Sequence, residues 1–368
     1  MSVLHPLSQM FNEKIKRLSI HKNCVYLNKD TIIELDSVDG ARWMVIGDAG
    51  SGKTYQSSIV LNQFKNVFFF DPTSRFRDTL TEQGLEDKWV YKFLSPKKKK
   101  RAFKINVQDL GKGDGIIHIL FPRSEDSDKK RLQRQAVEEF LDRKTKTYED
   151  WEEMCDKKKL NNIFTDLRWI LSEDDSAPDI LEMAVGRTVI DISEMSVRNP
   201  SLGVFLQSLI SARRRLKKKQ CLNPSNFVVV ALDEAQDYCR QFTPVGEAFA
   251  TLNLQARKYG LGELLIGSAY DNFHPDVRSK SNMKFVFLSP GITNQYRREG
   301  VDINMDDWDK LRKNECFIFS SDGEFNGVIN NDICFPDLYF KDVKKLNRIP
   351  KYVVKQKNSS FSVSKLFR

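Results

Sequence analysis

The stretch that decides the fold is ARWMVIGDAGSGKTYQSSIV, residues 41–60. An apolar run ends at Gly47, a glycine-rich turn follows, and the next residues are compatible with a helix. The turn matches the pattern G-x-x-x-x-G-K-[ST], in which glycines let successive backbone N–H groups point inward and surround phosphate oxygens. We therefore predict a strand over 43–46, a phosphate-binding loop (P-loop) and a helix over 55–64.

The residues of this loop have separate predicted roles. Lys53 can reach the β- and γ-phosphates as a point charge, and the Thr54 hydroxyl can ligate Mg²⁺. The helix that begins near Gly52 adds the positive end of its dipole. The alternative is a plain glycine turn, but the flanking strand and helix patterns favour phosphate binding. The predicted nucleotide-binding residues are Gly47, Asp48, Ala49, Gly50, Ser51, Gly52, Lys53, Thr54 and Tyr55.

A second motif lies in NFVVVALDEAQD, residues 226–237. An apolar strand delivers Asp233 and Glu234 at its carboxyl end, where ligands bind in open α/β sheets. An Asp in this position holds Mg²⁺, and a neighbouring carboxylate can orient and deprotonate the attacking water. We predict that Asp233 and Thr54 hold the metal and that Glu234 is the general base, against the alternative of a solvated acidic turn.

The bulk composition narrows the class of protein. With 368 residues and 40% hydrophobic content, the chain can hold one large core with additions, or two domains. A formal net charge of +9 favours an acidic partner such as nucleic acid, although a merely soluble basic protein is the alternative. The six cysteines include no C-x-x-C pair and the four histidines do not cluster with them. This pattern favours a reducing compartment and disfavours a zinc site.

The N-terminal sequence lacks the apolar core of a signal peptide, and no apolar run is long enough to span a bilayer. We therefore expect a soluble, cytoplasmic protein without a membrane span.

Short apolar runs alternate with helical stretches from Ala41 onward. Consecutive apolar positions are typical of strands covered on both faces, and the alternation predicts an α/β sheet with right-handed crossovers. An Asp–Glu pair in the second motif is typical of P-loop ATPases with an added strand between the two motifs (the ASCE type), and TVIDI is the candidate for that strand. The predicted strands are WMVI (43–46), VFFFD (67–71), IIHILF (116–121), TVIDI (188–192), FVVVAL (227–232), ELLIGSA (263–269), KFVFL (284–288) and CFIFS (316–320).

The chain divides by composition into a core with additions. A highly charged segment contains apolar residues at helical spacing (Leu132, Val137, Phe140, Leu141), which predicts a helical insertion. The predicted division is a short N-terminal extension with a small hairpin (1–40), a P-loop ATPase core (41–122 and 187–335), the charged helical insertion (123–186) and a basic C-terminal tail (336–368).

The chain resembles the FtsK–HerA superfamily of DNA-pumping ATPases, on the side of HerA, conjugation ATPases and viral packaging ATPases. The resemblance covers residues 41–70 and 187–330 and rests on TVIDISEMS, SLGVFLQSLISARRR, FVVVALDEAQDY, the stretch from LQARKYGLG to HPDVRSKSN, and LRKNECFIFSSDGEFNGVI. It implies a RecA-like P-loop NTPase core of the ASCE type, with a mostly parallel sheet and helices on both faces. It also implies ATP and Mg²⁺ as cofactors, and a homo-oligomeric ring, usually a hexamer, on double-stranded DNA.

Two further residues gain roles from this resemblance. Arg257 matches an arginine near the subunit boundary, which implies stabilisation of γ-phosphate charge in a neighbouring subunit; a surface arginine or an ion pair is the alternative. The family's sensor strand typically ends in Thr-Gln, whereas Gly267 and Ser268 stand there in this chain. Ser268 can still hydrogen-bond a phosphate or water, over a shorter reach.

DEAQD also resembles the second motif of superfamily 1 helicases. Those helicases need a long second motor domain, and we do not expect the residues after Asp237 to be enough to form one. The β-barrel that begins HerA proteins and the membrane helices common in FtsK and coupling proteins are not expected either.

Three basic runs are candidate DNA contacts: KKKKR (97–101), RRRLKKK (213–219) and the C-terminal tail. Lysine and arginine neutralise phosphates and give affinity that is independent of sequence, as a motor requires. The alternative for each run is a solvated face, and cations in the second run also complement the dipole of the helix that they end.

Together these features predict a cytoplasmic, ATP- and Mg²⁺-dependent DNA translocase of the FtsK–HerA type. Viral genome packaging, with a capsid or portal partner in an infected cell, or another mobile-element DNA transfer is the favoured setting. One alternative is a HerA-like DNA-processing translocase that acts with a nuclease. The other is an ATP-binding switch or scaffold that hardly turns over its nucleotide.

Overall fold

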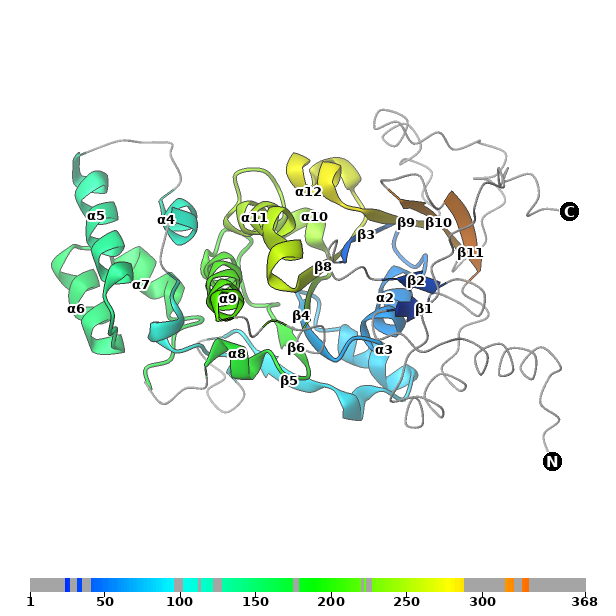
Figure 1. Ribbon diagram of the computed structural model, residues 1–368, viewed down its shortest axis with the longest axis horizontal. Coiled ribbons are helices and arrows are strands. Elements are labelled where there is room, and N and C mark those ends of the chain that lie inside the picture. Colours follow the sequence, from blue (N-terminus) through cyan, green and yellow to red (C-terminus); the bar gives the residue numbers. More distant parts are fainter. Residues whose placement is uncertain are drawn as a thin grey trace, which may run out of the picture.

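The computed structural model describes residues 24–26, 32–34, 41–95, 102–111, 114–121, 128–174, 179–219, 222, 227–287, 315–320 and 326–330. Within these residues a long twisted sheet passes through the molecule with helices on both of its faces (Figure 1).

The sheet has nine strands in the order β11-β10-β9-β3-β8-β7-β4-β6-β5. The strands from β9 to β5 in this order are parallel, and β10 pairs antiparallel with both β9 and β11. A separate antiparallel pair, β1 (Cys24–Tyr26) and β2 (Ile32–Glu34), forms the hairpin predicted in the N-terminal extension. The bounds of the sheet strands are β3 Arg42–Ile46, β4 Asn66–Asp71, β5 Val90–Phe93, β6 Arg187–Asp191, β7 Val228–Leu232, β8 Leu261–Gly267, β9 Met283–Phe287, β10 Glu315–Ser320 and β11 Asn326–Asn330.

Helices α2 and α3 cover one face of the sheet, and α9 and α11 cover the other (Figure 1). The bounds of the helices are α2 Lys53–Leu61, α3 Phe76–Glu82, α4 Asp114–Leu120, α5 Asp128–Asp142, α6 Tyr148–Lys157, α7 Asn161–Leu167, α8 Ile180–Met183, α9 Ser201–Lys218, α10 Ala235–Tyr238, α11 Pro244–Tyr259 and α12 Pro275–Lys280. Short 3₁₀ turns lie at η1 Glu86–Lys88, η3 Val107–Asp109 and η5 Tyr270–Asn272.

The two faces of β4 show why its sequence is apolar at consecutive positions. Phe68 points to the α9 side, where its ring centroid lies 5.2 Å from that of Phe205. Phe69 points to the opposite side and stacks on Phe76 of α3, with centroids 3.5 Å apart. Because successive strand residues alternate between faces, a strand covered on both faces buries all of them, and each full burial stabilises the fold by about 1.5–3 kcal/mol.

The prediction of a strand over IIHILF is wrong, because these residues lie in and just after helix α4. Ile116, Ile117 and Ile119 are buried, and α4 packs against both α9 and α11. A Cβ at Gly115 would lie 2.4 Å from Oε1 of Gln207, so a glycine lets α4 approach α9 closely. A short apolar run has the same composition whether it is a buried strand or a buried helix.

The strand TVIDI forms as predicted, as β6, but in the sheet it does not lie between β3 and β7, the strands that precede the two motifs. It pairs with β4 and β5, on the far side of β7. The strand between β3 and β7 is instead β8, which pairs in parallel with both. The sequence does not predict the edge strand β5, because VYKF is only partly buried and has no long apolar run.

Helices α5 to α8 form within the charged segment predicted to be helical. In Figure 1, α5, α6 and α7 lie at one end of the molecule, beyond α4. The apolar face of α5 buries Val137, Phe140 and Leu141, whereas the Leu132 side chain is 58% exposed, contrary to the predicted pattern. The buried face of α5 begins at Ala136, and Leu132 lies one helical turn before it.

Candidate active site

The P-loop connects β3 to α2, and its glycines meet specific steric demands. A Cβ at Gly47 would lie 2.5 Å from the Cβ of Phe287 on β9, so only glycine fits there. Gly50 and Gly52 have φ values of 77° and 102°, in the left-handed region that glycine adopts at low cost. Gly52 directly precedes α2, so the amino end of this helix faces the loop.

Lys53 lies between the loop and the acidic pair of the second motif. Its Nζ donates a hydrogen bond of 2.7 Å to the backbone oxygen of Asp48, across the turn. Burial lowers the pKa of Lys53, against the opposing charges of Glu234, Asp233 and Asp48. The ammonium is therefore positioned on the inner side of the loop, where it can meet anionic oxygens.

The two motifs meet at Thr54 and Asp233. The Thr54 hydroxyl donates to Oδ2 of Asp233 at 3.2 Å, although 179 residues separate them in the chain. Asp233 is 6% exposed, and burial raises its pKa to about 6, with Glu234 and Asp71 adding to the effect. A hydroxyl and a carboxylate side by side are the oxygen ligands that Mg²⁺ accepts, so the residues present fit the metal.

Ser51 gives an independent sign that the loop fits an anion. Its hydroxyl oxygen is buried and has no hydrogen-bond partner among the described residues. Buried polar groups in native proteins are almost always hydrogen-bonded, so such an atom needs an explanation. A phosphate oxygen in the loop would supply the missing partner.

Glu234 has a strained backbone. Its φ and ψ are 45° and 37°, in the left-handed region that a non-glycine residue rarely adopts, and it immediately precedes α10. Such a conformation costs on the order of 1–3 kcal/mol and is concentrated at functional sites. The strain aims the Glu234 side chain away from the direction that a continuing strand would give it.

Ser268 follows β8 and lies beside the second motif. Its backbone N–H donates to Oε1 of Gln236 at 3.2 Å. The preceding residue, Gly267, accepts a hydrogen bond of 3.2 Å from the Gly47 N–H. Because β3, β8 and β7 are adjacent and parallel, their carboxyl ends bring the P-loop, Ser268 and the acidic pair to one edge of the sheet.

Gln236 has no predicted role, but it takes part in this site. It is 6% exposed, and its Nε2 donates to Oε2 of Glu234 at 2.6 Å. The letter Q of DEAQD is the only sequence signal for it, and that signal does not show that the side chain turns back toward Glu234.

The other predicted site residues have mixed outcomes. Asp48, Ala49 and Gly50 are exposed on the loop, and Tyr55 is half-buried in the first turn of α2. Arg257 lies in α11, but its side chain is outside the described residues, so its role stays a prediction.

A cavity of about 500 Å³ opens beside Glu234, at the carboxyl ends of β4, β6 and β7. Its lining residues are Pro72, Thr73, Val197, Arg198, Glu234, Asp237, Tyr238, Arg240 and Thr243.

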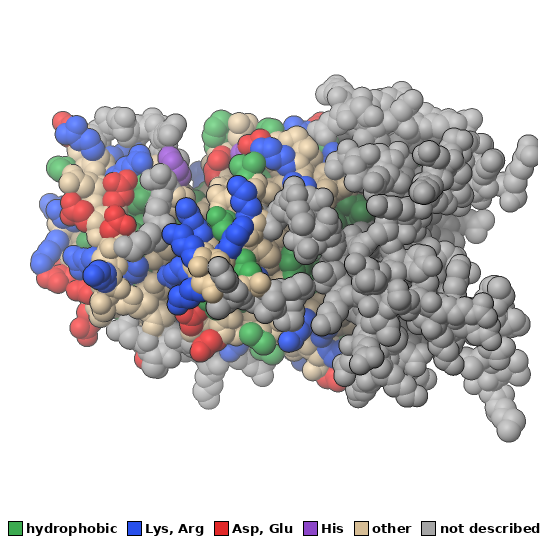
Figure 2. Space-filling view, in the orientation of Figure 1, with side chains coloured by type: hydrophobic (Ala, Val, Ile, Leu, Met, Phe, Trp, Pro, Cys, Tyr) green, Lys and Arg blue, Asp and Glu red, His purple; other side chains and the backbone are tan. Residues whose placement is uncertain are grey.

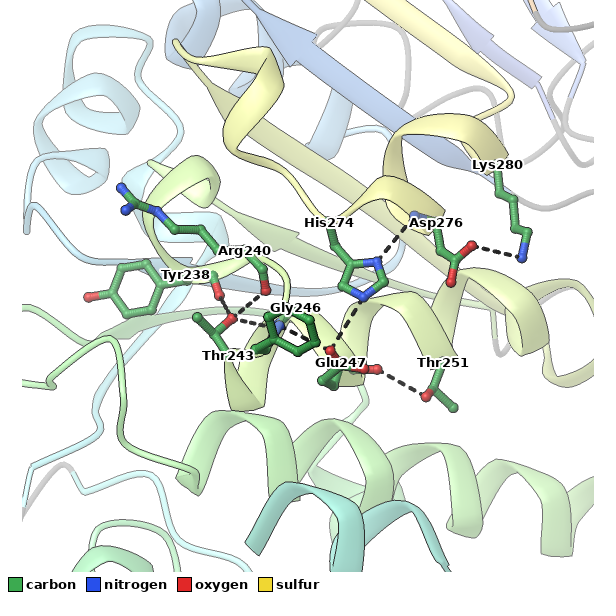
Figure 3. Close-up of polar contacts among 10 residues, drawn as sticks. Tyr238, Arg240, Thr243, Gly246, Glu247, Thr251, His274, Asp276 and Lys280 are labelled. Atoms are coloured by element: carbon green, nitrogen blue, oxygen red, sulfur yellow. Dashed lines mark hydrogen bonds and ion pairs between the residues drawn. The ribbon is translucent and has the colours of Figure 1, made fainter. Parts of the chain in front are cut away.

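The loop from α10 to α11 forms one wall of this cavity and is held by side-chain hydrogen bonds (Figure 3). Thr243 donates to the backbone oxygens of Tyr238 and Arg240, and its hydroxyl accepts from the Gly246 N–H. His274 ties this region to α12, because its Nε2 lies 3.4 Å from Oε1 of Glu247 and its Nδ1 accepts from the Asp276 N–H. The wall next to Glu234 is therefore fixed from two sides.

The basic run at 213–219 divides into a buried and an exposed part. Arg213 is 2% exposed and donates to the backbone oxygens of Tyr259 and Gly260, so this residue of the candidate run faces neither DNA nor solvent. Burial lowers the pKa of Arg213 to about 10. Residues Arg214, Arg215, Lys217, Lys218 and Lys219 are exposed, and Figure 2 shows lysine and arginine side chains concentrated in the region of α9. The runs at 97–101 and 336–368 lie outside the described residues.

None of the helices in the described ranges combines the length and the apolar character needed to cross a membrane.

The fold is similar to those of two proteins of known structure, VirB4 and TrwB. VirB4 of Thermoanaerobacter pseudethanolicus matches with a TM-score of 0.53 and 15% sequence identity, over 82% of this chain and 95% of that chain. The bacterial conjugative coupling protein TrwB, in complex with sulphate, matches with a TM-score of 0.53 and 13% identity, over 87% and 92%. The plasmid coupling protein TrwB in complex with the non-hydrolysable GTP analogue GDPNP matches with a TM-score of 0.54 and 12% identity, over 94% of each chain.

These likenesses confirm the predicted fold, a RecA-like P-loop NTPase core with a mostly parallel sheet. Comparison with protein-family models and with curated proteins found no match.

Proposed function

We propose that this chain is an ATP- and Mg²⁺-dependent motor of the FtsK–HerA type that moves double-stranded DNA. The observation that carries the proposal is the meeting of the two motifs at Thr54 and Asp233, next to a strained Glu234. This arrangement supports the proposal because it brings the predicted phosphate-binding loop, the predicted Mg²⁺ ligands and the candidate base to one edge of the sheet.

The proposed reaction is the hydrolysis of ATP to ADP and phosphate. The loop N–H groups and Lys53 hold the β- and γ-phosphates, and Thr54 and Asp233 hold Mg²⁺, which would neutralise phosphate charge. Glu234 accepts a proton from a water molecule as the water oxygen bonds to the γ-phosphorus and the bond to the β–γ bridging oxygen breaks. Ser268 is proposed to orient the phosphate or the water from the end of β8.

The motor is proposed to be a ring with ATP at each subunit boundary. Arg257 would stabilise γ-phosphate charge in the neighbouring subunit, and the ring would most simply be a hexamer. The exposed basic end of α9 supplies cations for DNA phosphates. The similar fold of TrwB, a bacterial conjugative coupling protein, supports a role in DNA transfer by a mobile element, and viral genome packaging is a second setting for such a motor.

The test is ATP turnover by the Glu234→Gln variant. The amide keeps the shape of the side chain but cannot accept the proton, so ATP should bind normally while hydrolysis falls by roughly 10²–10⁴-fold. Asp237→Asn is the matched control, because Asp237 lines the same cavity and pairs with Arg240 instead of facing the P-loop. Turnover by Glu234→Gln within a few-fold of wild type would remove Glu234 from its role.

A further inference from the structure

Gln236 uses both ends of its side-chain amide in the candidate site. Its Nε2 donates to the Glu234 carboxylate at 2.6 Å, and its Oε1 accepts from the Ser268 N–H at 3.2 Å. A backbone N–H can only donate and an ionised carboxylate can only accept, so the two partners fix which end of the amide faces which group. The buried side chain is thus held in one orientation between α10 and the end of β8.

The end of β8 leaves space for this amide. A Cβ at Gly267 would lie 2.4 Å from Oε1 of Gln236 and 2.7 Å from the Cζ atom of Phe273. Any side chain at position 267 would therefore push the amide or the Phe273 ring away. Gly267, which stands where the family has the Thr of its Thr-Gln ending, leaves the space that the Gln236 amide occupies.

The same strand end is bonded to the P-loop. The Gly47 N–H donates to the Gly267 oxygen at 3.2 Å, and Ser268 is the next residue along the chain. A continuous path of hydrogen bonds and one peptide unit therefore runs from the P-loop through Gly267, Ser268 and Gln236 to the Glu234 carboxylate.

We propose that Gln236 is the positioning residue for Glu234 and that it links the carboxylate to the P-loop through the end of β8. The inference rests on the proposed ATPase function. The Gln236 amide selects one rotamer of the Glu234 side chain, whose backbone is already strained. Because the end of β8 carries Gly267 and Ser268 instead of a sensor glutamine, Gln236 reaches this strand end from α10. Displacement of the strand end by a bound nucleotide would move the amide and, with it, the carboxylate.

The experiment measures steady-state ATP turnover, affinity for a fluorescent ATP analogue and the melting temperature for wild type, Gln236→Ala and Gln236→Asn. Asparagine is one methylene shorter, so it fills most of the buried space but withdraws the amide from Glu234. Loss of one hydrogen bond to a charged group should lower kcat by about 10- to 100-fold. Affinity for the analogue should stay within about twofold, because Gln236 does not face the P-loop glycines. Gln241→Ala, an exposed glutamine in the following loop, should behave as wild type.

A fall in kcat without a matching fall in affinity or melting temperature would support the positioning role. A kcat within twofold of wild type in a folded variant would overturn it, as would a loss that follows the melting temperature and so reports only packing. Glu234→Gln separates the two proposals. If Glu234→Gln is inactive and the Gln236 variants are active, only the inference about Gln236 fails. If wild type does not hydrolyse ATP, or if Glu234→Gln remains fully active, the proposed function fails as well.

Discussion

At the scale of single residues, the candidate site combines a buried carboxyl group, that of Asp233, with a strained backbone, that of Glu234. Asp233 and Glu234 are consecutive, yet one is buried with a raised pKa and the other starts α10 in a left-handed conformation. The sequence predicts the place of both residues at the end of β7, because an acidic pair closing an apolar strand is a local pattern, and their roles stay predictions. It predicts neither the strained backbone of Glu234 nor the contact of Gln236 with Ser268, which depends on where β8 ends beside β7.

A second buried acid, Glu263, gives a prediction about stability. It lies on β8 with no exposed surface, accepts from the Asn253 side chain, and its other oxygen has no hydrogen-bond partner among the described residues. Burial raises its pKa from 4.5 to about 8, against the opposing charge of Arg42 on β3.

The folded state therefore holds this proton more tightly than the unfolded state does. The contribution of the protonated Glu263 carboxyl to the free energy of unfolding is complete below pH 4.5. It is lost as the pH rises toward 8, because Glu263 ionises at lower pH in the unfolded state than in the folded state. Glu263→Gln cannot ionise and should be more stable than wild type at pH 8.5, with a smaller difference at pH 5. Denaturant midpoints at the two pH values measure this, and a difference that does not change with pH would contradict it.

At the scale of elements, most runs that are apolar at consecutive positions form strands as predicted, but their places in the sheet are not predicted. WMVI, VFFFD, FVVVAL and KFVFL are strands because both of their faces are covered. TVIDI is a strand, but in the sheet β8 and not TVIDI lies between β3 and β7, because strand order depends on crossovers that leave no local signal. The predicted element for IIHILF is wrong, because its buried face fits a helix between α9 and α11.

The end of α9 gives a prediction about DNA binding. Lys217, Lys218 and Lys219 are exposed, so neutralising all three to glutamine should weaken duplex binding equally for different sequences. Each lysine that neutralises a phosphate adds about 0.9 to the steepness of the decrease of log affinity with log salt, so its replacement should make this decrease shallower by about 0.9. The matched control is the other lysine triplet, Lys157 to Lys159, which is exposed at the end of α6 and carries the same charge.

An equal decrease of the slope in both triplet variants would show a general charge effect and would remove α9 as the DNA surface. The Arg213→Ala variant should separate an effect on protein stability from an effect on DNA binding. The Arg213 guanidinium faces the interior and donates to backbone oxygens at the end of α11. The substitution should lower stability and leave the salt slope unchanged.

At the scale of the whole molecule, parallel strands bring residues distant in the sequence to one edge of the sheet. The P-loop follows β3, the acidic pair follows β7, and Ser268 follows β8 between them. The rest of the core supports this edge, with α2 and α3 on one face and α9 and α11 on the other (Figure 1). The basic end of α9 lies on the molecular surface, so the candidate nucleotide site and the candidate DNA contacts belong to the same α/β core.

In the proposed function, ATP hydrolysis drives movement along double-stranded DNA. The most direct measurement is displacement of a third-strand oligonucleotide from a duplex, followed over time with ATP and Mg²⁺. Wild type should displace the third strand, duplex DNA should stimulate its ATP turnover, and Glu234→Gln should bind duplex without displacement. A wild-type protein that hydrolyses ATP at the same rate with and without duplex, and leaves the third strand in place, would contradict the account.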